Sequence, residues 1–262
     1  MSGTATPLPM TPARRFWLAI GTPVCLVLAG WIGLNLVALV GQGQFPVSHD
    51  IPPGAGQVTV NVSEGRVHLQ GAAGGQAQLT GTAHYTLVRP SFTTKVTTSG
   101  PDFGYDCKFP VGNCDLDATV RVPRATAASV HTGGGDATVS GTAGDVTVTT
   151  DGGSVSAEQV SGNLTLTTNG GDITASAITA PRVTATTAGG DVTVVFTRVP
   201  VIVDVTTDGG RITIVVPPGR THYHLTEHTG GGTTSGQIPT DSSSPNVITA
   251  TTGGGDITVR QS

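Results

Sequence analysis

The chain has 262 residues and a formal net charge of −4; 11% of its residues are charged, 4% are aromatic and 38 are glycine. A mildly acidic chain without basic patches and interleaved aromatic residues lacks what nucleic-acid binding needs, so no nucleic-acid partner is expected. The abundance of valine and threonine, which suit a pleated surface, favours an ordered β-protein over a disordered chain.

An apolar segment lies near the start of the chain. Residues 16–40 contain no charged side chain, and at about 1.5 Å per residue they can cross a ~30 Å hydrocarbon core. Arg14 and Arg15 precede the segment, and no positive charge follows until Arg66, so the positive-inside rule places the N-terminus in the cytoplasm. We therefore predict a cytoplasmic tail (1–15), a single-pass signal anchor in the plasma membrane (16–40) and an extracytoplasmic remainder. A cleaved secretory signal is the alternative.

The next part of the chain carries short alternating stretches. Residues 41–56 are expected to form a linker, and residues 57–126 an N-terminal β region that includes a pair of strands within 77–88. Cys107 and Cys114 flank a short loop with proline and glycine. Outside the cytoplasm such a pair most often forms a disulfide, here stapling an excursion of the chain; a metal pair is the alternative, although no clustered histidine accompanies it.

A turn motif recurs from residue 127 to the C-terminus. Its clearest copies read LTTNGGDITA from Leu166, ATTAGGDVTV from Ala185 and ATTGGGDITV from Ala250. The second glycines of the pairs are spaced 18–23 residues apart, and a period of this kind marks a repeat architecture. The turn residues assigned in this way are Gly134, Gly135, Asp136, Gly152, Gly153, Gly170, Gly171, Gly189, Gly190, Gly209, Gly210, Gly254, Gly255 and Asp256.

Each period is expected to hold two short strands and two turns. In a β-solenoid one period forms one coil and equivalent residues stack into columns, whereas in an antiparallel meander each glycine pair would be a hairpin tip. The constant phase of the motif favours the solenoid. The predicted fold class is therefore all-β, with a parallel β-solenoid over residues 127–262 and one N-terminal transmembrane helix. The glycine pairs are expected to supply positive-φ positions at the turns.

The chain resembles the DUF4097 family of adhesin-like, β-solenoid bacterial surface proteins over residues 58–260. The resemblance rests on the repeated Gly-Gly-Asp turn, on the cysteine pair, and on two short motifs, Pro53-Gly54 before Val58-x-Val60 and Val120-Arg-Val-Pro123. It implies a surface-exposed β-solenoid and supplies no catalytic residues.

The aspartates of the repeat are candidate cation ligands. Asp172 and Asp191 occur in consecutive copies and would lie ~4.8 Å apart on adjacent coils, where carboxylate and turn carbonyl oxygens could hold calcium. Ser154 and Arg211 take the same place in two other copies. The alternative is that these aspartates cap turns, with no cofactor bound.

Two other groups of side chains could act as sites. The histidines at 222, 224 and 228 could hold zinc or copper, or be ordinary surface residues. The aromatic residues could bind carbohydrate or cap one end of the solenoid. This aromatic cluster comprises Tyr85, Phe92, Phe103, Tyr105 and Phe109.

No nucleophile elbow, phosphate-binding loop or catalytic triad is readable in the chain, and basic residues that could hold an acidic polysaccharide are sparse. We therefore expect a non-catalytic module for adhesion or interaction in the cell envelope. Its partner would be a cell-wall polymer or another envelope protein, contacted along the Thr- and Gly-rich strand faces or at sheet edges. The alternatives are an accessory or sensory component of envelope-stress signalling and a carbohydrate-active enzyme.

Overall fold

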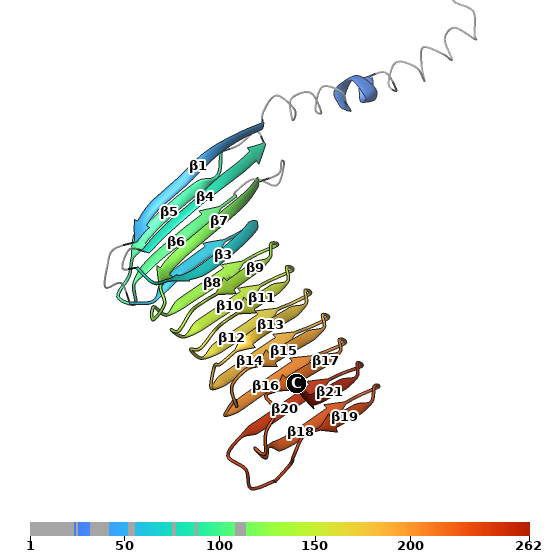
Figure 1. The fold of residues 1–262 in the computed structure, drawn as a ribbon. Coiled ribbons are helices and arrows are strands. Elements are labelled where there is room, and N and C mark those ends of the chain that lie inside the picture. Colours follow the sequence, from blue (N-terminus) through green and yellow to red (C-terminus); the bar gives the residue numbers. More distant parts are fainter. Residues whose placement is uncertain are drawn as a thin grey trace, which may run out of the picture.

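The computed structural model describes residues 24, 26–31, 42–51, 56–74, 77–86, 89–107 and 114–262. The strands of this part form two long sheets that face each other and are wound as a β-solenoid, in which each coil gives one strand to each sheet (Figure 1). The strands are β1 (Gln42–Ile51), β2 (Val58–Val62), β3 (Gly65–Ala72), β4 (Ala77–Thr86), β5 (Ser91–Val96), β6 (Pro101–Asp106), β7 (Cys114–Pro123), β8 (Ala128–Thr132), β9 (Ala137–Ser140), β10 (Val146–Thr150), β11 (Val155–Glu158), β12 (Leu164–Thr168), β13 (Ile173–Ile178), β14 (Arg182–Thr187), β15 (Val192–Phe196), β16 (Ile202–Thr207), β17 (Ile212–Val216), β18 (His224–Thr229), β19 (Thr234–Gln237), β20 (Val247–Thr252) and β21 (Ile257–Gln261).

The two sheets differ by one in their number of strands. The eleven-stranded sheet has the order β1-β4-β7-β3-β9-β11-β13-β15-β17-β21-β19, and the ten-stranded sheet has the order β18-β20-β16-β14-β12-β10-β8-β2-β6-β5. All pairings are parallel except those of β1 with β4, β4 with β7 and β5 with β6. The parallel ladders confirm the solenoid and show that the antiparallel meander is wrong.

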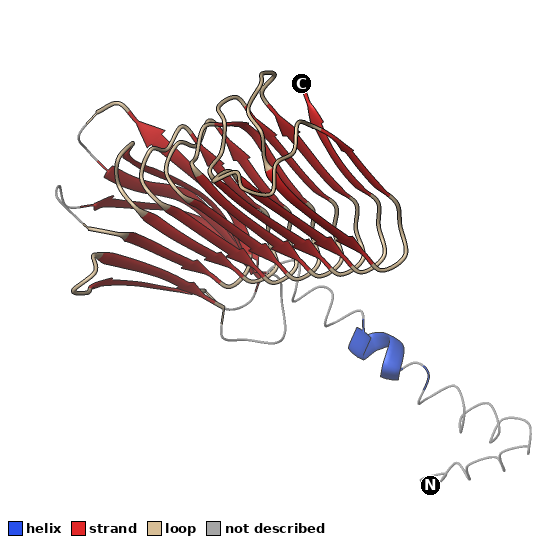
Figure 2. Cartoon of the chain, turned by 90° about the horizontal axis from the view of Figure 1, so that it is seen from below, coloured by secondary structure: helices blue, strands red, loops and turns tan. Residues whose placement is uncertain are grey.

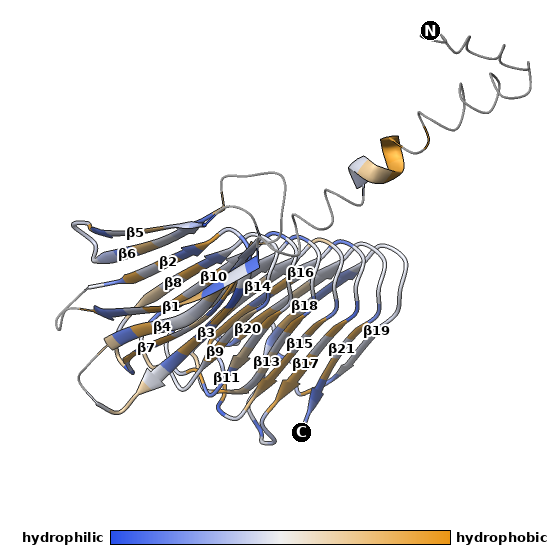
Figure 3. Ribbon diagram, turned by 90° about the horizontal axis from the view of Figure 1, so that it is seen from above, coloured by the Kyte–Doolittle hydropathy of each residue, from blue (hydrophilic) through white to orange (hydrophobic). Residues whose placement is uncertain are grey.

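Alternate residues of each strand fill the space between the sheets. Val148, Leu166 and Ala185 pair in register across β10, β12 and β14, and all three are fully buried. The alternation of apolar and polar residues along the strands is visible in Figure 3. Because the coils stack in register, each apolar position forms a column along the core, as the repeat predicts.

The order of coils in space departs from the order in sequence at both ends. The β2–β3 coil lies between β6–β7 and β8–β9, and the β20–β21 coil lies between β16–β17 and β18–β19. The last coil in the sequence is therefore the second to last in space. Residues 217–246, which interrupt the repeat, form the terminal coil.

Several boundaries differ from those expected from the sequence. The expected linker at 41–56 contains β1, which pairs with β4 along its whole length. The expected strand pair within 77–88 is the single strand β4. The N-terminal β region is continuous with the repeats, because its strands extend both sheets, and Cys107 and Cys114 form a disulfide there.

Most of the predicted anchor, together with Arg14 and Arg15, lies outside the described residues. Within the described part, residues 24 and 26–31 are helical. Among the described residues, the structure contains no helix whose length and apolar character would let it span a bilayer.

The glycine pairs do not have the conformation that we predicted. The positive-φ glycines among the described residues are Gly65, Gly100 and Gly141, and none belongs to a repeat pair. The second glycine is needed for another reason: a Cβ at Gly153 or Gly190 would clash with the main-chain carbonyl of the glycine in the preceding coil. The coils approach too closely at this edge to admit a side chain, and the turns form a regular row there (Figure 2).

A ladder of hydrogen bonds runs beside these glycines. In β10, β12, β14, β16 and β20 the last threonine is buried, and its hydroxyl joins two coils. The Thr207 Oγ1 donates to Gly190 O at 3.0 Å and accepts from Gly210 N at 3.1 Å. Thr168, two coils earlier, makes the same pair of bonds with Gly153 and Gly171. The threonine of the Thr-x-Gly-Gly sequence therefore hydrogen-bonds its own turn to the turn of the preceding coil.

Candidate functional site

The outer face of the ten-stranded sheet carries two rows of hydroxyl groups, which we call the hydroxyl face. The strands expose alternate residues on this face, so a Thr-x-Thr sequence in each strand places one threonine in each row. The first row is Thr59, Ser129, Thr147, Thr165, Thr184, Asp204, Thr249 and Thr226. The second row is His131, Thr149, Thr167, Thr186, Thr206, Thr251 and His228.

The spacing of the two rows is set by sheet geometry. Neighbouring strands lie about 4.8 Å apart, and residues i and i+2 of one strand lie about 6.6 Å apart. Threonine hydroxyls therefore form a regular array over β10, β12 and β14, and the second row continues it across β16 and β20. One charged side chain, Asp204, interrupts the first row.

The hydroxyls of the second row are available to a ligand. Their side chains are partly exposed, and among the described residues none of these hydroxyls hydrogen-bonds to another protein group. They differ in this respect from the buried threonine that ends each of the same strands. The hydroxyl face can therefore donate to and accept from a partner at many regularly spaced points.

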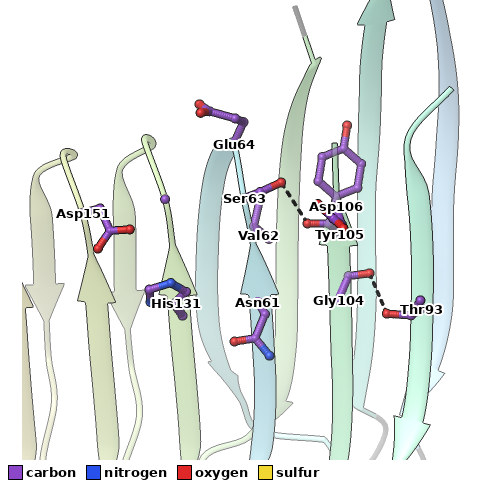
Figure 4. Close-up of a pocket in the computed structure, with 11 residues that line it drawn as sticks. Asn61, Val62, Ser63, Glu64, Thr93, Gly104, Tyr105, Asp106, His131 and Asp151 are labelled. Carbon is purple, nitrogen blue, oxygen red and sulfur yellow. Dashed lines mark hydrogen bonds between the residues drawn. The ribbon is translucent and has the colours of Figure 1, made fainter. Parts of the chain in front are cut away.

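A pocket lined mainly by polar residues lies at the N-terminal end of the hydroxyl face. It has a volume of about 640 Å³ and is lined by the ends of β2, β6, β8 and β10 together with β5. Asn61, His131 and Thr93 lie on strands, while Glu64 and Asp151 lie at turns (Figure 4). The side chain of Ser63 donates to Tyr105 O at 3.1 Å and thereby fixes the wall between β2 and β6.

The charge of the pocket restricts its ligands. Its lining contains three carboxylates, those of Glu64, Asp106 and Asp151, and no lysine or arginine. Tyr105 is also a lining residue, but its ring lies in the core, where burial and then the charge of Asp115 raise its pKa to about 12. The pocket suits a neutral or cationic ligand with hydrogen-bonding groups and disfavours an anion.

The repeat aspartates cap the main chain of the next coil. Asp172 Oδ1 accepts from Asp191 N at 2.8 Å, and Asp191 Oδ1 accepts from Arg211 N at 2.7 Å. The Arg211 guanidinium also lies 3.9 Å from Asp191 Oδ2. Through these bonds the aspartates cap the turns of the next coil. Among the described residues no group of three or more metal-ligating side chains could hold a metal ion.

Asp136 and Asp256 make the same contact with Ser154 and Thr233. Two bonds from Thr233, through N and Oγ1, hold the pKa of Asp256 below its usual value. The aspartates thus tie consecutive turns together along the solenoid axis.

The other two predicted groups lie at opposite ends of the solenoid. His224 and His228 are exposed on β18. Four members of the aromatic cluster lie on β4, β5 and β6 at the other end; Phe103 and Tyr105 are each 2% exposed, and Phe92 packs against them. Phe103 and Tyr105 therefore fill this end of the core, as the capping interpretation expects. Phe109 lies outside the described residues.

The sequence predicted threonine-rich strand faces but missed the pocket. Its lining residues come from positions 61 to 151, in strands that neighbour one another only because the β2–β3 coil is inserted between β6–β7 and β8–β9. No local pattern in the sequence signals that insertion.

The stacked parallel coils place the molecule among the two-sheet β-solenoids. The chain belongs to the DUF4097 family, described as Toastrack, whose model matches residues 50–260. No curated protein matches the chain.

The chain is also similar to several solved structures, but at low sequence identity and low TM-score. A "putative cell adhesion protein" from Clostridium sporogenes is 11% identical, with a TM-score of 0.39, over 84% of this chain and 100% of that one. A "putative lipid binding protein" from Parabacteroides distasonis is 11% identical, with a TM-score of 0.41, over 82% and 96%. A "putative adhesin" from Bacteroides fragilis is 13% identical, with a TM-score of 0.37, over 84% and 97%. Similarity this low carries no argument about ligand or partner.

Proposed function

We propose that this protein is a non-catalytic interaction or adhesion module of the cell envelope that binds a hydroxyl-rich polymer along the hydroxyl face. The observation that carries the proposal is the array of unpartnered threonine hydroxyls, which repeats with the coil and ends at the pocket with three carboxylates. A polymer with a regular repeat can contact several coils at once, and such multivalency raises affinity without any strong single contact.

The charge of the pocket narrows the partner to a neutral or amino-bearing polysaccharide. Glu64, Asp106 and Asp151 would repel a polymer rich in carboxylate or phosphate, and would attract amino groups. The proposal includes an anchor at residues 16–40, supported by the uncharged segment and by Arg14 and Arg15 before it, which would hold the solenoid on the outer side of the plasma membrane.

The test is retention of the detergent-solubilised chain on three insoluble polysaccharides: a neutral glucan, an amino-sugar polymer and a uronic-acid polymer. Retention is expected on the first two and not on the third. Thr186→Lys should weaken retention by blocking the second row, since its neighbours Thr167 and Thr206 are in register with it. Thr193→Lys is the matched control, because Thr193 is also a partly exposed threonine but lies in the eleven-stranded sheet.

Equal retention of Thr186→Lys and wild type would show that the hydroxyl face is not the binding surface. Release of soluble sugar from any of the polymers would contradict the non-catalytic part of the proposal. Absence of polysaccharide binding together with recovery of a specific envelope protein would favour the accessory role in signalling.

A further inference from the structure

The solenoid ends in an open coil at β18 and β19. β18 pairs with β20 and β19 pairs with β21, and no other described strand lies beside either of them. His224 N donates to Asn246 O at 2.8 Å, on the β20 side, so the main-chain groups of the next residue, Leu225, and of Glu227 point away from the sheet. Unpaired N–H and C=O groups of this kind are a template for another strand.

The same holds for the edge of the other sheet. Thr233 O accepts from Ile257 N and therefore points toward β21. Main-chain groups alternate sides along a strand, so those of Gly236, three residues further, point outward. One segment shields the start of the β18 edge, where Tyr223 N donates to Pro239 O and Asp241 N donates to Tyr223 O, each at 3.0 Å. That pairing stops before β18, and both edges are open beyond it.

A carboxylate interrupts the core at this end. The apolar column that runs through Val205 and Ala250 continues in register to Glu227 of β18, so an acidic side chain takes the place of an apolar one. Gly236 faces it from β19: a Cβ there would lie 3.1 Å from Glu227 Oε2, so the missing side chain leaves room for the carboxylate.

The carboxylate has no compensating partner. Glu227 Oε1 is buried and lacks a hydrogen bond. The inward residues of the elements that pack against it are Ile248, Ala250 and Thr252 from β20, Thr234 and Gly236 from β19, and Ile257 and Val259 from β21, and none is titratable. His224 and His228 of its own strand are on the outer face.

We propose that the β18–β19 end is a docking surface for the same end of a second copy of this chain, and that the ionised Glu227 carboxylate opposes this docking. When the side chain is neutral, the two open edges of one copy pair with those of the other and cover the half-buried Leu225. When it is charged, docking would bury two carboxylates close together without a counter-charge.

The end has two open edges, one in each sheet, and this favours a second solenoid end as the partner. A single peptide strand could pair with β18 or with β19, whereas another solenoid end offers two edges at the same separation. The opposite end of the solenoid is a poorer match. There the eleven-stranded sheet extends three strands beyond β3, while the ten-stranded sheet extends two beyond β2, so the edges are staggered. A contact between identical ends is isologous and closes as a dimer.

The carboxyl group is set to respond to acid. Burial raises the pKa of Glu227 above its ordinary value of 4.5, which favours the neutral form as the pH falls. Docking would remove more water from the group and place the partner's carboxyl nearby, and both effects raise the pKa further. Dimerisation should therefore take up protons. Docking uses the main-chain edge of β18, whereas a polymer would lie on the outer face of the sheet, so the docking proposal does not depend on polymer binding.

The experiment measures the mass of the detergent-solubilised full chain by light scattering after gel filtration. Wild type should be monomeric near neutral pH and dimeric below pH 4.5, the ordinary pKa of glutamate. Glu227→Gln keeps the shape and removes the charge, so it should dimerise at neutral pH with a dissociation constant at least about tenfold lower than that of wild type. Glu227→Lys should stay monomeric at both pH values.

Glu158→Gln is the matched control, because Glu158 is exposed on β11 in the middle of the solenoid and loses the same charge. It should behave as wild type, which separates the effect of position from that of net charge. A monomeric Glu227→Gln at both pH values would overturn the proposal, as would a wild type that dimerises equally at both. Open-ended oligomers would show that different ends join, and would overturn the pairing of identical ends.

Discussion

The two ends of the solenoid close the same core in different ways. At the N-terminal end the antiparallel strands β1, β4 and β5 extend the sheets, and Phe103 and Tyr105 fill the space between them. At the C-terminal end the last coil keeps the parallel register of the stack, its apolar residue Leu225 is half-buried, and Glu227 faces inward. One end is closed by reversed strands and large rings, and the other only by a charge.

This difference shows what stops a repeat from continuing. β5 runs against the other strands of its sheet, whereas β1, which is antiparallel to the reversed strand β4, runs in the same direction as the coils. A further coil therefore could not pair in parallel with both edge strands, and the stack ends there. β18 and β19 present the pattern that a further coil needs. An inward charge at an exposed edge is a known protection against such pairing, and Glu227 is placed to provide it.

The largest effect should come from removing a ring of the N-terminal cap. Phe103 is 2% exposed and is among the largest buried side chains. Phe103→Ala should lower the free energy of unfolding by about 3–5 kcal/mol, the usual cost of a large cavity. Leu225→Ala at the other end should cost less than about 2 kcal/mol, because that site is already half open. Urea denaturation followed by circular dichroism measures both; similar losses would show that the two ends are equally packed.

A second test compares the middle of the stack with its open end. Gly190→Ala should destabilise the protein by about 1–3 kcal/mol, because the new Cβ would collide with the carbonyl of Gly171. Gly232→Ala makes the equivalent collision with Gly255 but lies in the terminal coil, which can shift outward, so its cost should be smaller. The control is Gly189→Ala, whose Cβ would meet nothing closer than 4.0 Å; it should be neutral or slightly stabilising. Thermal melts would separate the three variants.

The third test removes one hydroxyl of the Thr–Gly ladder. Thr207→Val keeps the shape but leaves Gly210 N without the bond it donates to the hydroxyl, which should cost about 1–2 kcal/mol. Thr206→Val changes the preceding residue, which lies on the hydroxyl face, and should alter stability by less than about 0.5 kcal/mol. Equal melting temperatures for the two variants would mean that the ladder contributes nothing to the turns.

The repeat made the parallel solenoid predictable, because a fixed phase places equivalent residues in one column. The role of the glycines was not predictable from the sequence, since Gly-Gly can serve either a left-handed turn or a close approach of two backbones. Only the stacked structure shows that Gly190 serves the second purpose.

The order of the terminal coils depends on which side chain each coil places in the core, and the sequence alone does not show which coils become neighbours. The copy that begins at Ala250 is apolar at this core position, so its coil can be buried between two others. The segment HLTEHT has Glu227 at the same position, and a coil with an inward charge is least costly at the end of the stack. The threonine rows could be anticipated from Thr-x-Thr, whereas the pocket depends on which coils become neighbours.

The smallest expected effect is on the stability of the terminal coil β18–β19 in the monomer. Because burial raises the pKa of Glu227, the folded terminal coil binds a proton more tightly than the unfolded chain does. Its stability should therefore fall as the pH rises from below 4.5 through the raised pKa, and should be lowest near neutral pH. Glu227→Gln removes this dependence and should slow amide exchange in β18 near neutral pH by roughly two- to tenfold. The measurement is hydrogen exchange on dilute protein, below the concentration at which copies associate, with Glu158→Gln as control. If exchange in β18 were unchanged by the substitution, the charge would not weaken this end, and the closed and open ends would differ only in their packing.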